Sequence, residues 1–219
     1  MRHVFVETNW VVDVAAPAHH QKPAARSLLE RADAGELRLH LPAVCLGEAR
    51  RTIQKFKPRH EADAIRSFVG WGKVIGKIPD TDADVVLRIL NMFEIKVNAD
   101  LKRLDVTLSS LRERQGIEVF ALDEAMLERA IELSAGDLGY LQPFDQTILA
   151  AVLVRAEGLR AAGAIDVSFC ELDADLQPWD KNGNTKAPFK RRYDAAGLWV
   201  YGDFDLSEPA RPADRLAAR

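Results

Sequence analysis

Short segments rich in β-forming residues alternate along this chain with longer segments that have helical spacing. In one of them Leu37, Leu39 and Leu41 alternate with polar residues, the period of two that is typical of a strand. Strands that alternate with helices favour a mainly parallel sheet covered by helices. The fold expected is therefore α/β, a three-layer α/β/α sandwich. The strands expected are residues 3–7, 37–41, 117–121 and 165–170, and the helices expected are residues 9–14, 24–34, 43–56, 62–71, 80–114, 123–134 and 143–159.

Composition limits the class of protein. The chain has 219 residues, of which 47% are hydrophobic, enough for a substantial core. A formal net charge of −3 excludes a global basic field of the kind that binds nucleic acid unaided. Cys45 and Cys170 lie in apolar segments without zinc-binding spacing, and no apolar run reaches membrane-spanning length. We therefore expect a soluble, cytoplasmic protein with reduced cysteines and no membrane partner.

Residues 80–114 carry a continuous apolar stripe. Its members follow spacings of three and four: Val86, Leu90, Phe93, Val97, Leu101, Leu104, Leu108 and Leu111. Asn98 and Asp100 lie within the segment, so one bent helix and two shorter helices both fit the pattern. The stripe predicts core packing, or the seam of a homodimer.

The chain divides by composition into a main domain and two additions. Residues 1–177 form the domain, with a helical elaboration at about 57–115. Residues 178–219 form a C-terminal extension that contains a basic cluster with two aromatic residues, 186–193, and a short extra strand, 197–201. Residues 208–219 have the composition of a frayed tail. Stacking of Phe189 or Tyr193 on unpaired bases is one role that the cluster suggests.

Four segments place acidic residues where strands give way to helices or loops. Glu7 ends the first strand, Glu48 lies on the helix after the second, Asp145 opens a later helix, and Asp173 follows the last strand. Ligands of open α/β sheets bind beyond the carboxyl ends of the strands. Carboxylates that converge there repel one another and need a cation, and hard divalent ions prefer oxygen ligands. Such a cluster is typical of metal-dependent phosphodiester chemistry.

The order of these motifs resembles that of the PIN-domain nucleases, the fold of VapC-like toxins. The matching segments, within residues 3–177, are Phe5-Val6-Glu7-Thr8-Asn9, Glu48 after the second strand, Asp145-Gln146-Thr147-Ile148-Leu149-Ala150-Ala151, and Glu171-Leu172-Asp173-Ala174-Asp175. The resemblance implies a PIN-like fold and a metal-dependent endoribonuclease that hydrolyses RNA with Mg²⁺ or Mn²⁺. It also implies a toxin whose partner is an antitoxin protein that occupies its active site.

The resemblance also implies roles for individual residues. Glu7, Asp145 and Asp173 are the expected metal ligands, with Glu48 as the fourth acid of the site. Supporting roles fall to Thr8, Asn9 and Asp175, the last of which competes with Asp173. Basic residues expected to contact phosphates, or else to form a solvated charged face, are Arg50, Arg51, Lys190, Arg191 and Arg192.

The chain departs from the family pattern at two positions. The first acid is usually Asp and is Glu7 here, and the last motif usually begins with Thr and has Glu171 here. Glu171 either adds charge to the site or points away from it. These departures keep open a non-catalytic PIN-like module that binds RNA or protein. A phosphatase with a nucleophilic Asp is a third class, but Glu7-Thr8-Asn9 lacks the pair of acids that it needs.

Overall fold

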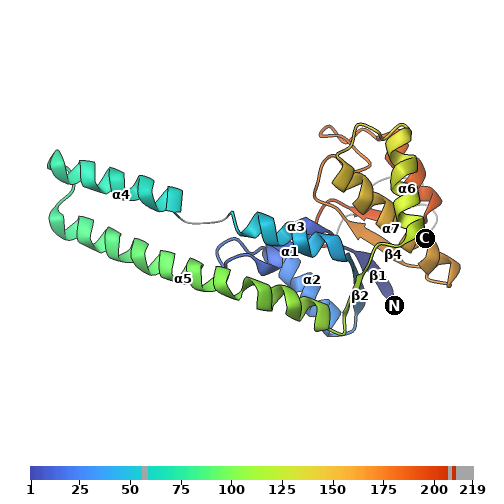
Figure 1. The fold of residues 1–219 in the computed structure, drawn as a ribbon, viewed down its shortest axis with the longest axis horizontal. Helices are drawn as coiled ribbons and strands as arrows, with labels where there is room; N and C mark the ends of the chain where they lie inside the picture. Colours follow the sequence, from blue (N-terminus) through green and yellow to red (C-terminus); the bar gives the residue numbers. More distant parts are fainter. Residues whose placement is uncertain (56–58, 207–208, 211–219) are drawn as a thin grey trace.

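A mainly parallel six-stranded sheet forms the centre of the protein (Figure 1). The computed structural model describes residues 1–55, 59–206 and 209–210. The sheet has the order β3-β2-β1-β4-β5-β6, in which the first five strands are parallel and β6 is antiparallel to β5. This confirms the expected α/β class. The strands are β1 (Arg2–Phe5), β2 (Leu37–Pro42), β3 (Ile117–Phe120), β4 (Val167–Cys170), β5 (Trp199–Tyr201) and β6 (Pro209–Ala210).

Helices gather on the two sides of the sheet. α1, α2, α3 and part of α5 pack together on one side, and α6 packs on α7 on the other (Figure 1). Asp123 caps α6 as its sequence suggests, since its side chain accepts a hydrogen bond from the Met126 N–H. The helices are α1 (Thr8–Ala15), α2 (Pro23–Asp33), α3 (Ala43–Ile53), α4 (Arg59–Val74), α5 (Asp80–Glu113), α6 (Glu124–Ala135), α7 (Pro143–Ala161) and α8 (Ala187–Ala195).

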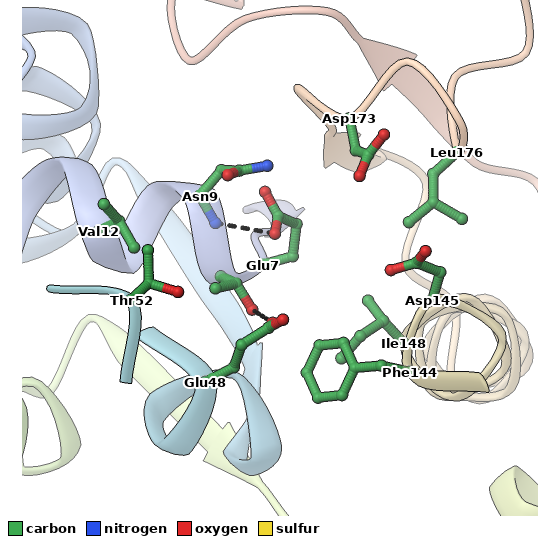
Figure 2. A pocket seen from close by; sticks show the side chains of 11 residues that line it. Glu7, Asn9, Val12, Glu48, Thr52, Phe144, Asp145, Ile148, Asp173 and Leu176 are labelled. Atoms are coloured by element: carbon green, nitrogen blue, oxygen red, sulfur yellow. Dashed lines mark hydrogen bonds between the residues drawn. The ribbon is translucent and has the colours of Figure 1, made fainter. Parts of the chain in front are cut away.

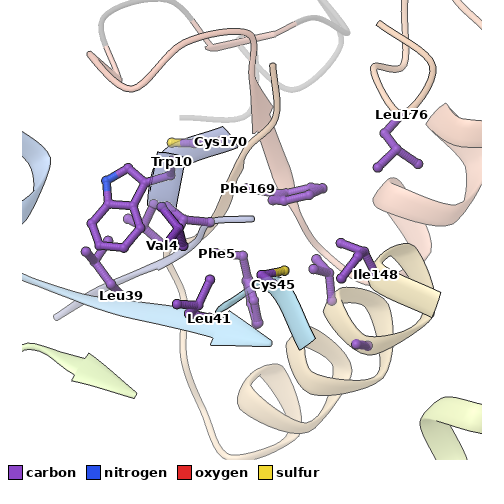
Figure 3. Close-up of a cluster of buried hydrophobic side chains, with 14 of the residues drawn as sticks. Val4, Phe5, Trp10, Leu39, Leu41, Cys45, Ile148, Phe169, Cys170 and Leu176 are labelled. Carbon is purple, nitrogen blue, oxygen red and sulfur yellow. The ribbon is translucent and has the colours of Figure 1, made fainter. Parts of the chain in front are cut away.

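The core is centred on β1, which has a parallel neighbour on each side. Val4 and Phe5 are completely buried, as a strand covered on both faces requires (Figure 3). Phe169 on β4 and Leu39 on β2 extend the same cluster. Trp10 of α1 is also fully buried, and its indole N–H donates to the Ala25 carbonyl oxygen at 3.1 Å. This bond ties α1 to α2 beside the core.

The long segment that contains the apolar stripe is one helix, α5, of 34 residues. Its C-terminal part packs on the body of the protein, whereas its N-terminal part pairs with α4 in a hairpin that projects from the body (Figure 1). Most of the stripe is buried within the chain, at Leu90, Val97, Leu104, Leu108 and Leu111. Core packing therefore accounts for this stripe.

The C-terminal extension adds to the same sheet and core. β5 pairs with β4, and Phe189 and Tyr193 of α8 are buried. The Tyr193 hydroxyl donates to the Leu176 carbonyl oxygen at 2.8 Å. The expected stacking of these two rings on bases is therefore wrong, because neither ring is accessible. Of the expected frayed tail, all but Pro209 and Ala210 lies outside the described residues. No helix in the described ranges is both long and apolar enough to cross a membrane.

Candidate active site

The four acids of the sequence motifs line one cavity at the carboxyl edge of the sheet (Figure 2). The cavity has a volume of about 310 Å³. Glu7 comes from the β1–α1 junction, Glu48 from α3, Asp145 from α7 and Asp173 from the loop after β4. Parallel strands bring these segments to one edge although they are far apart in sequence. The remaining lining residues are Thr8, Asn9, Val12, Thr52, Phe144, Ile148 and Leu176.

Glu7 is the most buried of the four lining acids, with 6% of its surface exposed. It caps α1, and its Oε2 accepts a hydrogen bond from the Asn9 N–H at 2.8 Å. Its Oε1 is buried without a partner among the described residues. Burial raises the pKa of Glu7 to about 8, and the charges of Glu48 and Asp173 add to the rise while hydrogen bonds from Asn9 oppose it. The site thus holds a carboxylate that lacks a compensating positive charge.

Glu48 is oriented by a neighbour from another element. It lies on the second turn of α3, half-buried, and its Oε2 accepts a hydrogen bond from the Thr8 hydroxyl at 2.5 Å (Figure 2). Because Thr8 directly follows Glu7, this bond couples the positions of the first two acids. The supporting role expected of Thr8 thus has a specific contact behind it.

Asp145 on α7 and Asp173 on the loop after β4 lie on the same side of the cavity, opposite Glu7 and Glu48 (Figure 2). Burial raises the pKa of Asp145 to about 6, helped by the charges of Asp173, Glu48 and Asp175. Asp173 accepts a hydrogen bond from the Asp175 N–H through its Oδ1 at 2.8 Å. Asp175 itself is exposed and does not line the cavity. Of the two competing acids, Asp173 is the one that the structure places in the site.

Glu171 is a fifth acid that the sequence left undecided. It is fully buried, and its Oε1 accepts a hydrogen bond from the Asp173 N–H at 2.6 Å. Burial raises its pKa well above the ordinary value, and the charges of Glu7, Asp173 and Asp145 act in the same direction. Its Oε2 has no partner in the described structure. Glu171 therefore lies behind the site, where its carboxyl group keeps a proton to higher pH than an exposed glutamate does.

The five basic residues expected near phosphates lie outside the cavity lining. Arg50 makes an ion pair with Asp105 on α5 at 2.6 Å, and Arg51 is exposed. On α8, Lys190 pairs with Asp194, and both Arg191 and Arg192 pair with Asp137. The cavity lining contains no Lys, Arg or His among the described residues. No described side chain therefore places a positive charge at its centre.

The apolar part of the lining was not anticipated from the sequence. Val12, Phe144, Ile148 and Leu176 form it. A signal for two of them exists in helical spacing, because Ile148 lies one turn after Asp145 and Val12 one turn after Thr8. In these two helices, the residue one turn after a site residue therefore also reaches the cavity.

The carboxylates share a cavity without forming a tight metal cage. Across residues 1–55, 59–206 and 209–210, no three His, Cys, Asp or Glu side chains are grouped closely enough to hold a metal ion. Mg²⁺ does not require such a cage, because it usually keeps several waters and binds one or two carboxylates. The oxygen-only set of acids is of the type that Mg²⁺ and Mn²⁺ prefer.

Comparison with known proteins adds no family to this picture. No protein-family model matches the sequence, and no curated protein matches it either. The features that mark this site are the cavity, its four lining acids, the buried Glu171 behind them, and their electrostatics.

Proposed function

We propose that this protein is a metal-dependent endoribonuclease with a PIN-like fold. The observation that supports this best is the convergence of Glu7, Glu48, Asp145 and Asp173 on one cavity of about 310 Å³. These acids come from four distant segments, so local sequence does not explain why they meet. No basic residue lies among the described lining residues, and four carboxylates alone repel a phosphodiester. A divalent cation bound to them would offset this repulsion.

The residues present fit a hard divalent ion. The Oε1 of Glu7 is a buried acceptor without a hydrogen-bond partner among the described residues. Burial raises the pKa values of Glu7 and Asp145, the neighbouring acids add to the rise, and a bound cation would oppose both effects. Glu7, Asp145 and Asp173 are the residues that would hold Mg²⁺ or Mn²⁺, directly or through water. When bound, such an ion polarises the scissile phosphate and lowers the pKa of an attacking water.

The other residues of the site have positioning roles. The Thr8 hydroxyl holds Glu48 by a hydrogen bond, and the Asn9 N–H holds Glu7. Phe144, Ile148 and Leu176 give the cavity an apolar wall, which lowers the local dielectric and strengthens electrostatic interactions beside it. Asp145 lies in the first turn of α7, where the helix dipole favours its ionised form.

The choice of RNA as substrate rests on the resemblance of the four acidic motifs to PIN-domain ribonucleases. The same resemblance supports a VapC-like toxin whose activity is blocked by an antitoxin. We propose both as the working assignment, with intracellular RNA as the target.

Asp145→Asn tests the proposal. Wild type should cleave RNA with Mg²⁺ or Mn²⁺, and the variant should lose at least a hundredfold in rate, because it loses a ligand charge. Its melting temperature should change little, since Asp145 is half-exposed at a helix end. Glu124→Gln is a matched control, because Glu124 is an exposed acid in the first turn of α6, away from the cavity. Equal activity of wild type and Asp145→Asn across several RNAs and both metals would overturn the assignment.

The same assay separates the nuclease from a non-catalytic module. A module that only binds RNA or protein would keep its binding after Asp145→Asn and in EDTA, and would show no metal-dependent cleavage. One observation favours the non-catalytic module. A proton shared between the buried side chains of Glu7 and Glu171 can relieve their repulsion without a metal ion.

A further inference from the structure

The projecting α4–α5 hairpin has two apolar sides, only one of which is used within the chain. The inner seam joins Val69 and Gly72 of α4 to Ala83, Leu90 and Val97 of α5, all buried. A second set of apolar residues on the hairpin is exposed. Its members are Phe68 (65%), Trp71 (61%), Ile75 (43%), Val85 (52%), Val86 (38%), Ile89 (61%) and Met92 (66%).

These exposed residues lie on one side of the hairpin. Phe68 and Trp71 each precede a seam residue of α4 by one position, and Ile89 precedes the seam residue Leu90 of α5. The two helices are antiparallel, so an approximate two-fold axis exchanges them. A residue that lies one position before a seam residue therefore points to the same side of the hairpin on either helix. Arg66 bonds to Asn91 and Glu94, which places Phe68 and Trp71 near the level of Ile89.

The exposed apolar area of this face is larger than the largest apolar patch on a typical monomer. At roughly 100 Å² exposed for each of the seven side chains, the face covers on the order of 700 Å². The largest apolar patch of a typical monomer is about 300–600 Å², and a standard protein interface buries about 800 Å² per partner. The hairpin projects from the body, so the face is accessible to a large partner (Figure 1). The loop after α1 marks its inner limit, where His19 contacts Phe93 with ring centroids 4.8 Å apart.

Charge placement on α5 identifies the partner. Asp82 and Lys96 are exposed and lie seven residues before and seven residues after Ile89. Seven residues correspond to about 10.5 Å along a helix. If two copies of α5 pack antiparallel with Ile89 beside Ile89, Asp82 of each copy faces Lys96 of the other. A parallel arrangement would oppose like charges. The surface is thus complementary to itself, as a two-fold interface requires.

We infer that this protein forms a homodimer through the exposed face of the hairpin, with the two arms antiparallel in a four-helix bundle. This interface shares only Val86 with the apolar stripe of residues 86–111, whose buried members Leu90, Val97, Leu104, Leu108 and Leu111 are used inside each chain. Ile89 lies at the two-fold axis, and Phe68 and Trp71 pack beside it. The inference does not depend on the proposed nuclease activity.

Light scattering during size-exclusion chromatography of the full chain tests the inference. Wild type should have twice the mass of one chain at micromolar concentration. Ile89→Lys should be monomeric, and Ile131→Lys should remain dimeric. Ile131 is the matched control, because it is an isoleucine on a helix surface with 70% exposure, on α6. A monomeric wild type, or equal effects of the two variants, would overturn the inference.

Charge reversal and crosslinking test the antiparallel register. Asp82→Lys and Lys96→Asp should each raise the dimer dissociation constant at least tenfold, and the double variant should return it toward the wild-type value. Because Cys45 and Cys170 are buried, Ile89→Cys provides a single accessible thiol. A short bis-maleimide should link two copies of Ile89→Cys but not of Ile131→Cys. A double variant no better than the single variants, or an unlinked Ile89→Cys, would refute the arrangement.

Discussion

Glu7→Gln is expected to stabilise the metal-free protein at pH 8 and to remove its stabilisation by Mg²⁺. Glutamine has nearly the same shape as glutamate, and its carbonyl oxygen can still accept the hydrogen bond from the Asn9 N–H. It carries no charge, so it avoids the cost of ionising a buried group beside Glu48, Asp173 and Glu171.

The size of the effect follows from the pKa of Glu7, which rises from 4.5 to about 8 on folding. Between these pH values the folded protein keeps a proton that the unfolded chain has released. The stabilisation present below pH 4.5 is therefore lost as the pH rises through 8, at about 1.4 kcal/mol per pH unit. The total is about 5 kcal/mol, a large part of the stability of an ordinary domain. Glu171 acts in the same direction.

Urea denaturation between pH 5 and 8.5 in EDTA measures this effect. The free energy of unfolding of Glu7→Gln minus that of wild type should grow by several kcal/mol across the range. The variant is compared with wild type because His40 changes the stability of both proteins in the opposite direction. Burial lowers the pKa of His40 to about 3, so the fold loses stability as the pH falls below 6.5. Mg²⁺ at pH 8 should stabilise wild type but not the variant. A difference that stays constant with pH, with Glu124→Gln as the baseline, would refute the burial argument.

Two further predictions address the site and the backbone. Thr8→Val removes the hydrogen bond to Glu48. We expect calorimetric titration to show that the affinity for Mg²⁺ is weakened by about 10- to 100-fold, as for other groups that orient a metal ligand. Unchanged affinity would exclude Thr8 as a positioning residue. Gly116→Ala would bring a Cβ into the Ala32 carbonyl oxygen, and we expect it to lower the stability by about 1–3 kcal/mol. Gly158 lies within α7, and a Cβ there would meet no atom within 4 Å. We therefore expect Gly158→Ala to raise the stability, measured by thermal unfolding, by about 0.5–1 kcal/mol. Equal melting temperatures for these two variants would contradict the packing around Gly116.

Periodicity in the sequence was enough to predict most of the regular structure. The alternation at Leu37, Leu39 and Leu41 marks β2, and the three-four spacing from Leu90 to Leu111 marks α5, because strand and helix periods are local properties of the backbone. The sequence did not predict α8. Its buried rings, Phe189 and Tyr193, stand among basic residues, and only their packing on the core shows that they face inward.

The four site acids were also found in the sequence, since each stands where a strand gives way to a helix or loop. Their environment was not predictable, because desolvation and charge coupling depend on atoms from other segments. Glu171 could equally have faced solvent, and only the fold buries it behind Glu7 and Asp173. The exposed face of the hairpin is a similar case. Apolar spacing shows that Phe68, Trp71 and Ile89 lie on helix faces, but the tertiary structure decides which face each helix gives to its own chain and which it leaves open.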